Sequence, residues 1–237
     1  MSDFLKARLT TEPLGRALAQ GKITRSTYNE IISRKSDLEH AMKKIEIASE
    51  VAPFPPTHIV PEGIYDFEYN IVVHAHNTLF KTSKFVYLII ELSCPSVLYM
   101  EKPMFLGLLA HEFLHYVVFT IDFHRELTER SAEGDEKSPI VMGLIPNKEK
   151  MTLVQRDQYF YGDPEVWFKD RDVIQAVGKL ESERCSSHGH ALADKVMEWM
   201  NENRLMKEFE RGKVVGYKGE ITLHQPIIER AKKLKIL

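Results

Sequence analysis

The chain has 237 residues, of which 43% are hydrophobic and 28% charged, and its formal net charge is −2. This length allows one large domain with a substantial core. The only two cysteines, Cys94 and Cys185, exclude a disulfide-stapled scaffold and indicate a reducing compartment. The segment that follows Met1 lacks the apolar run of a secretory leader, so we expect a cytoplasmic protein.

The first fifty residues predict helices. Gly21 ends an apolar segment that begins near Leu14, and Thr24 is placed to cap a second helix running to about Ser49. This order of helix, Gly-x-Ile-Thr and helix resembles the helical hairpin of small oligomerisation modules, which implies homo-oligomer contacts through these helices. A proline-rich linker is expected over residues 51–63, because prolines interrupt regular helix.

The next segments are rich in β-branched and aromatic residues. Ile64–Val73 and Lys84–Leu92 are predicted as strands joined through His74–Ser83, and Ser96–Met100 as a last short strand. Met104–Phe123 is then long and apolar enough to resemble a membrane span. It contains histidines and acids that a lipid-facing helix would hardly tolerate, so a buried helix and no membrane association are expected.

The strongest chemical signal lies in that apolar helix, where residues 111–115 read HEFLH. Residues four apart share one face of an α-helix, so His111 and His115 can reach one ion while Glu112 lies beside it. This pattern is typical of a Zn²⁺ site at which the metal acidifies a water molecule and the glutamate takes its proton. The alternative is two core histidines around a structural glutamate, but burying three titratable groups without partners would be costly.

A catalytic zinc usually takes three protein ligands, so a third donor is expected elsewhere. The metzincin spacing is excluded, because Val118 and Ile121 stand where that class has glycine and histidine. The segment HGHALADKVM (188–197) offers His188 and His190. These two lie about 200° apart around a helix, so only one of them can face the metal. Glu183 and Glu181, just before this segment, are further candidates.

Two segments resemble the SprT-like family of zincin metallopeptidases. LLAHEFLHYVVF (108–119) is similar to the active-site helix of that family, and residues 188–197 resemble its His-Gly-x-x-Phe helix, with Leu192 in place of the aromatic residue. The resemblance implies that His111, His115 and His188 bind zinc and that Glu112 is the general base. His190, followed by Glu183 or Glu181, remains the alternative third ligand.

The resemblance also implies an α+β, zincin-like fold. A small mixed or antiparallel sheet would pack on the HExxH helix, with helical extensions at both ends of the chain. The expected divisions are a helical segment (1–50), the linker (51–63), a catalytic domain (64–206) with an insertion (131–163), and a basic hairpin and helix (207–237).

The expected function is a zinc-dependent metallopeptidase that hydrolyses peptide bonds through a zinc-activated water. A protein or peptide substrate would pair by strand addition with backbone within Lys84–Met100. Tyr159, Tyr161 or a histidine would stabilise the oxyanion. Asp122 lies on the same helical stripe as the histidine pair, so it either orients a ligand imidazole or is a surface acid.

A zincin-fold protein that binds DNA or a protein partner, with a structural or vestigial metal site, is the alternative function. Residues 204–237 carry nine Lys and Arg against four Asp and Glu. A basic tail of this kind can contact nucleic acid, although it is more often a solvated face. An intact Glu112 favours the enzyme, since structural zinc needs no base. A third option is a zinc hydrolase that acts on non-peptide amides.

Overall fold

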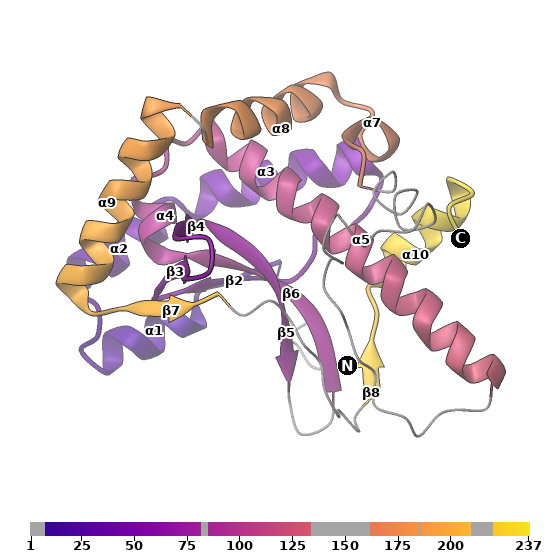
Figure 1. Cartoon of the computed structure of the whole chain (residues 1–237), viewed down its shortest axis with the longest axis horizontal. Coiled ribbons are helices and arrows are strands. Elements are labelled where there is room, and N and C mark those ends of the chain that lie inside the picture. The colour runs from indigo at the N-terminus through magenta and orange to yellow at the C-terminus, as the bar shows by residue number, and fades with distance from the viewer. Residues whose placement is uncertain (1–7, 82–84, 134–161, 185, 210–219) are drawn as a thin grey trace.

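The computed structural model describes residues 8–81, 85–133, 162–184, 186–209 and 220–237. In these residues helices surround a mixed sheet, as Figure 1 shows, which confirms the α+β class. Most of the expected insertion at 131–163 lies outside the described residues. So do Tyr159 and Tyr161, the two tyrosines expected to stabilise an oxyanion.

The chain opens with three helices, α1 (Glu12–Ala19), α2 (Arg25–Ser33) and α3 (Lys35–Ser49). Gly21 has a φ of 67°, a left-handed conformation that glycine adopts readily, and it follows the end of α1. The Thr24 hydroxyl accepts a hydrogen bond of 3.1 Å from the Thr27 amide, so the predicted cap is confirmed. The second predicted helix is interrupted at Arg34, whose guanidinium donates to the carbonyl oxygens of Val97 and Met100.

The larger sheet is built around a long central strand. Its members are β1 (Leu9–Thr10), β2 (Thr57–Val60), β5 (Ala75–Lys81), β6 (Phe85–Ser93) and β8 (Glu220–Thr222). One side of β6 pairs in parallel with β2 and β8, and its other side pairs with β5 in antiparallel register. Among the described strands β5 therefore forms an edge of the sheet, whereas β6 lies in its interior.

Two predicted segments differ from the observed elements. His74–Ser83, expected as a connection, contains strand β5. Of the segment Ser96–Met100, expected as a strand, all but the capping residue Met100 lies in helix α4 (Cys94–Tyr99). Pro95 explains the second difference, because proline has no amide hydrogen for a sheet and its fixed φ suits the first turn of a helix.

The expected strand over Ile64–Val73 is instead a hairpin of β3 (Gly63–Asp66) and β4 (Ile71–Val73). The Asp66 carboxylate accepts hydrogen bonds from the amides of Glu68 and Tyr69, which turns the chain between the two strands. β3 also pairs with β7 (Met206–Glu208), so these three strands form a second sheet.

The segment 51–63, for which the sequence predicts a linker, contributes strand β2 to the larger sheet. All four residues of β2 are buried, between β1 and β6. Prolines therefore mark only the approach to the strand. The amide of Phe54 in this approach donates to the buried carboxylate of Glu46 on α3, at 2.7 Å. That bond ties the N-terminal helices to the sheet.

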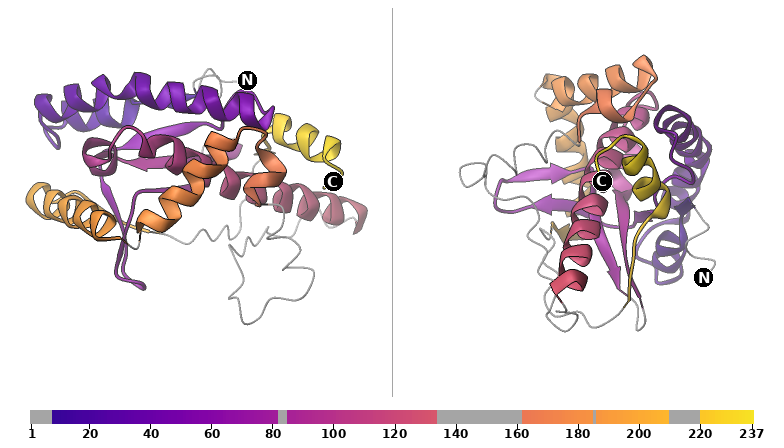
Figure 2. Two further views of the ribbon diagram at one scale, coloured as in Figure 1. Left: turned by 90° about the horizontal axis from the view of Figure 1, so that it is seen from above. Right: turned by 90° about the vertical axis from the view of Figure 1, so that its right-hand side faces the viewer.

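The long helix α5 (Met104–Glu133) carries the HEFLH segment and runs between α3 on one side and α8 (Arg171–Arg184) on the other, as Figure 2 shows. A Cβ atom placed on Gly107 would lie 2.4 Å from the carbonyl oxygen of Ala176, so only glycine allows α8 to approach so closely. Met104–Arg125 is long and apolar enough to cross a membrane, yet 72% of its most apolar stretch is buried inside the protein. Such burial is what a core helix requires.

The remaining helices are α7 (Pro164–Trp167), α9 (Ser187–Asn203) and α10 (Gln225–Lys233). The basic C-terminal helix α10 packs on α5 through buried Ile227 and Ala231. Its Arg230 is nearly buried and lies 2.5 Å from the carboxylate of Glu50, at the end of α3. Part of the basic charge of the tail is therefore paired within the fold.

Glu91 of β6 links the two sheets. Its Oε2 lies 2.9 Å from Nε2 of His76 on β5 and 2.5 Å from Nζ of Lys207 on β7. Burial raises the pKa of this carboxyl, but the hydrogen bond from His76 and the positive charge of Lys207 together lower it to about 2. Glu91 is therefore ionised and paired from neutral pH down to strongly acidic conditions.

This lowered pKa predicts a loss of stability in acid. A carboxylate whose pKa is lower in the folded chain than in the unfolded chain stabilises the fold above its unfolded pKa. That contribution, about 3 kcal/mol by linkage, is lost as the pH falls from 4.5 towards 2. Urea unfolding of metal-free protein at pH 7, 4 and 3 should therefore show a shallower pH dependence for Glu91→Gln than for the wild type. Parallel curves for the two proteins would contradict the pairing.

Candidate metal centre

His111 and His115 lie on one face of α5, as their spacing predicts. Their Nε2 atoms are 3.0 Å apart, and the ring centroids are 4.6 Å apart with the rings nearly perpendicular. Two nitrogen ligands at zinc bond lengths in a tetrahedral site lie about 3.3 Å apart, so this spacing is close to that of a zinc-binding pair. Both side chains are half-buried. The helix therefore presents two imidazole nitrogens in hydrogen-bond contact with each other, at a separation close to that of two zinc ligands.

Glu112, between these histidines in the sequence, is buried and is held by a residue that the sequence did not single out. Nδ2 of Asn77 on β5 donates to Oε2 of Glu112 at 2.9 Å and to the main-chain oxygen of Glu112 at 3.1 Å. Asn77 lies in a segment expected as a connection, where asparagine is ordinary. Its role becomes visible only once β5 is placed against α5.

Among the proposed third ligands, Glu181 contacts one histidine of the pair, at the ring nitrogen that faces away from the other histidine. Oε1 of Glu181, near the end of α8, lies 3.8 Å from Nδ1 of His111. The close packing of α8 on α5 at Gly107 accounts for this approach. The Glu181 side chain is 60% exposed and so has room to change rotamer. Glu183 instead lies 3.5 Å from Nζ of Lys179.

The other two candidates lie at the beginning of α9. Nε2 of His188 is 3.7 Å from Oε1 of Glu101, and the His188 side chain is 55% exposed. His190 is exposed as well. No contact of His188 or His190 with the histidine pair is present in the described part of the chain, where no three His, Cys, Asp or Glu side chains form a complete ligand set. The structure thus places the two histidine nitrogens together, with the carboxylate of Glu181 beside the other ring nitrogen of His111.

Asp122, expected either to orient a ligand imidazole or to lie at the surface, is half-buried two turns along α5 from His115. Burial raises the pKa of its carboxyl to about 6, while the charge of Arg125 acts in the opposite direction. Its Oδ1 is buried and has no hydrogen-bond partner among the described residues. The proposed contact between Asp122 and a ligand imidazole therefore stays a prediction.

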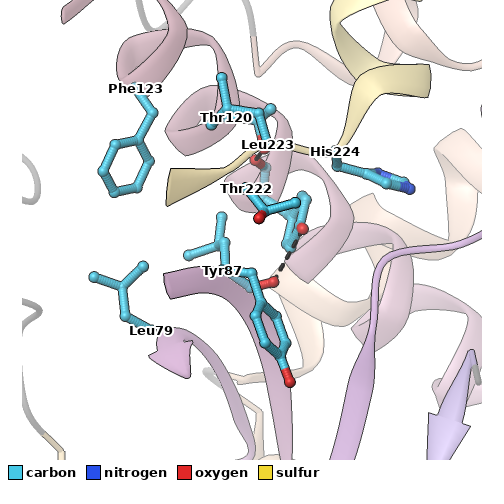
Figure 3. Close-up of a pocket in the computed structure, with 9 residues that line it drawn as sticks. Leu79, Tyr87, Thr120, Phe123, Thr222, Leu223 and His224 are labelled. Atoms are coloured by element: carbon cyan, nitrogen blue, oxygen red, sulfur yellow. Dashed lines mark hydrogen bonds between the residues drawn. The ribbon is translucent and has the colours of Figure 1, made fainter. Parts of the chain in front are cut away.

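A small pocket lies between α5, the sheet and the approach to α10, and Figure 3 shows its lining residues. The lining is largely apolar and includes Leu79, Tyr87 and Phe123. None of His111, Glu112 and His115 lines it. Burial lowers the pKa of His224, at the margin of this pocket, to about 4, so that imidazole is neutral at pH 7.

The paired histidine nitrogens and the buried carboxylate of the intervening Glu112 therefore define the candidate site by their own geometry. His111, His115 and Glu112 come from a single turn of α5, while Asn77 and Glu181 come from elements on either side of it. Family models, curated proteins and solved structures were all compared with the chain, and none matches it.

Proposed function

We propose that this chain is a zinc-dependent metallopeptidase with a zincin-like arrangement of sheet and helix. The observation that carries the proposal is the pair of Nε2 atoms, 3.0 Å apart on one face of a mostly buried helix, with a buried carboxylate at the intervening position Glu112. Neutral imidazole nitrogens are favoured zinc ligands, and the donor chemistry of this pair fits the metal.

The ligand set that the geometry supports best is His111, His115 and Glu181. Glu181 takes the place of His188, because its carboxylate already lies 3.8 Å from the His111 ring whereas His188 faces Glu101. In its present rotamer Glu181 faces Nδ1 of His111 and not the paired Nε2 atoms, so this exposed side chain would have to change rotamer to complete a set of three protein ligands. One position would then be left for water. When bound, zinc would acidify that water and polarise the scissile carbonyl.

Glu112 would serve as the general base. It takes the proton of the attacking water and passes it to the leaving amine. The carboxylate is buried and accepts a hydrogen bond from Asn77, so its orientation is restricted, unlike that of a carboxylate exposed to solvent.

The substrate is proposed to bind along β5. The strand expected for this role, within Lys84–Met100, is β6, and β6 is already paired on both sides. β5 is an edge strand in the described residues, and its Asn77 contacts the base. An extended peptide that added to this edge would therefore lie next to Glu112.

The test of this proposal is zinc affinity, measured by competition with a chromophoric chelator, together with zinc-dependent cleavage of an unfolded protein substrate. Glu181→Ala should weaken zinc binding by more than the roughly 10- to 100-fold that the loss of an outer partner of a ligand costs, whereas His188→Ala should bind zinc as the wild type does. The opposite ranking would restore His188 as the third ligand. If the wild-type protein binds no zinc, the proposed metallopeptidase function is wrong.

A zincin-fold binding protein is the second candidate. It is favoured by Lys232, Lys233 and Lys235, which remain exposed at the C-terminal end while Arg230 is paired with Glu50. These lysines could contact the phosphates of a nucleic acid. In such a protein Glu112 would have no proton to transfer. Replacing Glu112 should therefore abolish the activity of a metallopeptidase but leave the activity of a binding protein unchanged.

A further inference from the structure

We infer that Asn77 is a positioning residue for Glu112, helping to hold the carboxylate of the proposed base in one orientation from the edge strand of the sheet. The inference rests on the proposed function, since it assigns Asn77 a part in the same reaction. Its side chain would act through Glu112 and not through contact with the substrate or the metal.

The contacts of Asn77 carry the inference. Its single NH₂ group donates to two oxygens of the same residue, Oε2 at 2.9 Å and the main-chain oxygen at 3.1 Å. An amide nitrogen has two hydrogens, so both bonds form at once. The bond to the main chain fixes the amide relative to α5, and the bond to Oε2 then fixes the carboxylate relative to the same helix.

The burial of Asn77 and Glu112 protects the hydrogen bond between them from water. Asn77 is 7% exposed and Glu112 is 6% exposed, so water cannot readily replace the amide donor. A hydrogen bond to an ionised carboxylate is stronger than one between neutral groups, and more so away from water. The hydrogen bond from the Asn77 amide therefore opposes rotation about the three side-chain torsions of Glu112.

Strand β5, which carries Asn77, is also held in place by contacts on its opposite face. β5 pairs with β6 along its whole length, and side chains alternate between the two faces of a strand. His76, next to Asn77, therefore faces away from α5, where Glu91 binds it and Lys207 binds Glu91. A slip of one residue would turn Asn77 away from the base, and these contacts oppose such a slip.

Positioning matters because a general base must lie within hydrogen-bond reach of the proton that it removes. A displacement of about 1 Å at a reacting group can cost about 100-fold in rate. Asn77→Ala should therefore lower kcat by about 10- to 100-fold while KM and the zinc affinity stay at wild-type values. Asn77→Val, which suits a strand and also lacks the donor, should give the same loss if the alanine variant folds poorly.

A double-substitution cycle separates positioning from structure. In a Glu112→Gln background the residual kcat should not fall further when Asn77 is replaced, because the base on which Asn77 acts is already absent. Tyr116→Phe is the matched control. The Tyr116 hydroxyl donates to the carbonyl oxygen of Leu88 at 3.0 Å and ties the same helix to the same sheet without touching Glu112. It should lower the melting temperature and leave kcat unchanged.

Three results would overturn the inference. If the Asn77 variants keep the wild-type kcat, the inference about Asn77 is wrong while the proposed metallopeptidase function is unaffected. An equal further loss of kcat in the Glu112→Gln background, or a loss that follows zinc affinity or melting temperature, would make Asn77 structural. A wild-type chain without zinc-dependent hydrolysis would overturn the proposed function, and this inference with it.

Discussion

Glu112→Gln is expected to bind zinc as tightly as the wild type and to lose about 10²–10⁴-fold in kcat. Glutamine has the shape of glutamate, and its side-chain oxygen can still accept the hydrogen bond from Asn77, so the buried site should keep its packing. It cannot take a proton from water. Zinc titration and cleavage of an unfolded protein substrate, performed on the same preparation, measure the two quantities.

Glu101→Gln is a suitable control, because Glu101 is an exposed acid beside His188 and carries no part of the proposed chemistry. It should leave both zinc affinity and kcat unchanged. The metallopeptidase would be contradicted if Glu112→Gln cleaved the substrate as fast as the wild type. If neither protein cleaves and both bind a partner or nucleic acid equally, the binding protein is the better description.

Phe113→Ala should produce the largest loss of stability, about 3–5 kcal/mol, because it empties the centre of an aromatic cluster. Phe113 is completely buried, and its ring lies 5.9 Å from that of Phe54, 5.7 Å from that of Phe168 and 6.3 Å from that of Trp167. These partners come from the approach to β2 and from the α7 region. Their contacts fix α5 between the N-terminal and C-terminal parts of the chain.

Thermal and urea unfolding of metal-free protein measure this loss. For a chain of this size, each kcal/mol lowers the melting temperature by about 2–4 °C, so a decrease of about 6–20 °C is expected. Phe119→Ala, on the same helix but only half-buried, is the matched control and should cost less. Equal losses for the two variants would contradict the central place of Phe113.

Local patterns in the sequence determined the elements whose geometry depends on near neighbours. The face shared by His111 and His115 follows from the helical repeat alone, and the two rings do meet. The cap at Thr24 depends on a residue three positions away. The strand predicted over Lys84–Leu92 is present as β6, because its apolar run is buried in the interior of the sheet.

Tertiary structure alone decided which residues lie beside the candidate site. Asn77 and Glu112 are separated by 35 positions, and no local pattern pairs an asparagine in an assumed connection with a glutamate on a helix. Glu181 approaches His111 because α8 packs closely on α5 at Gly107. Spacing in the sequence gives neither the distance from Asn77 to Glu112 nor the distance from Glu181 to His111. Both distances depend on how the helices and strands pack together around the whole core.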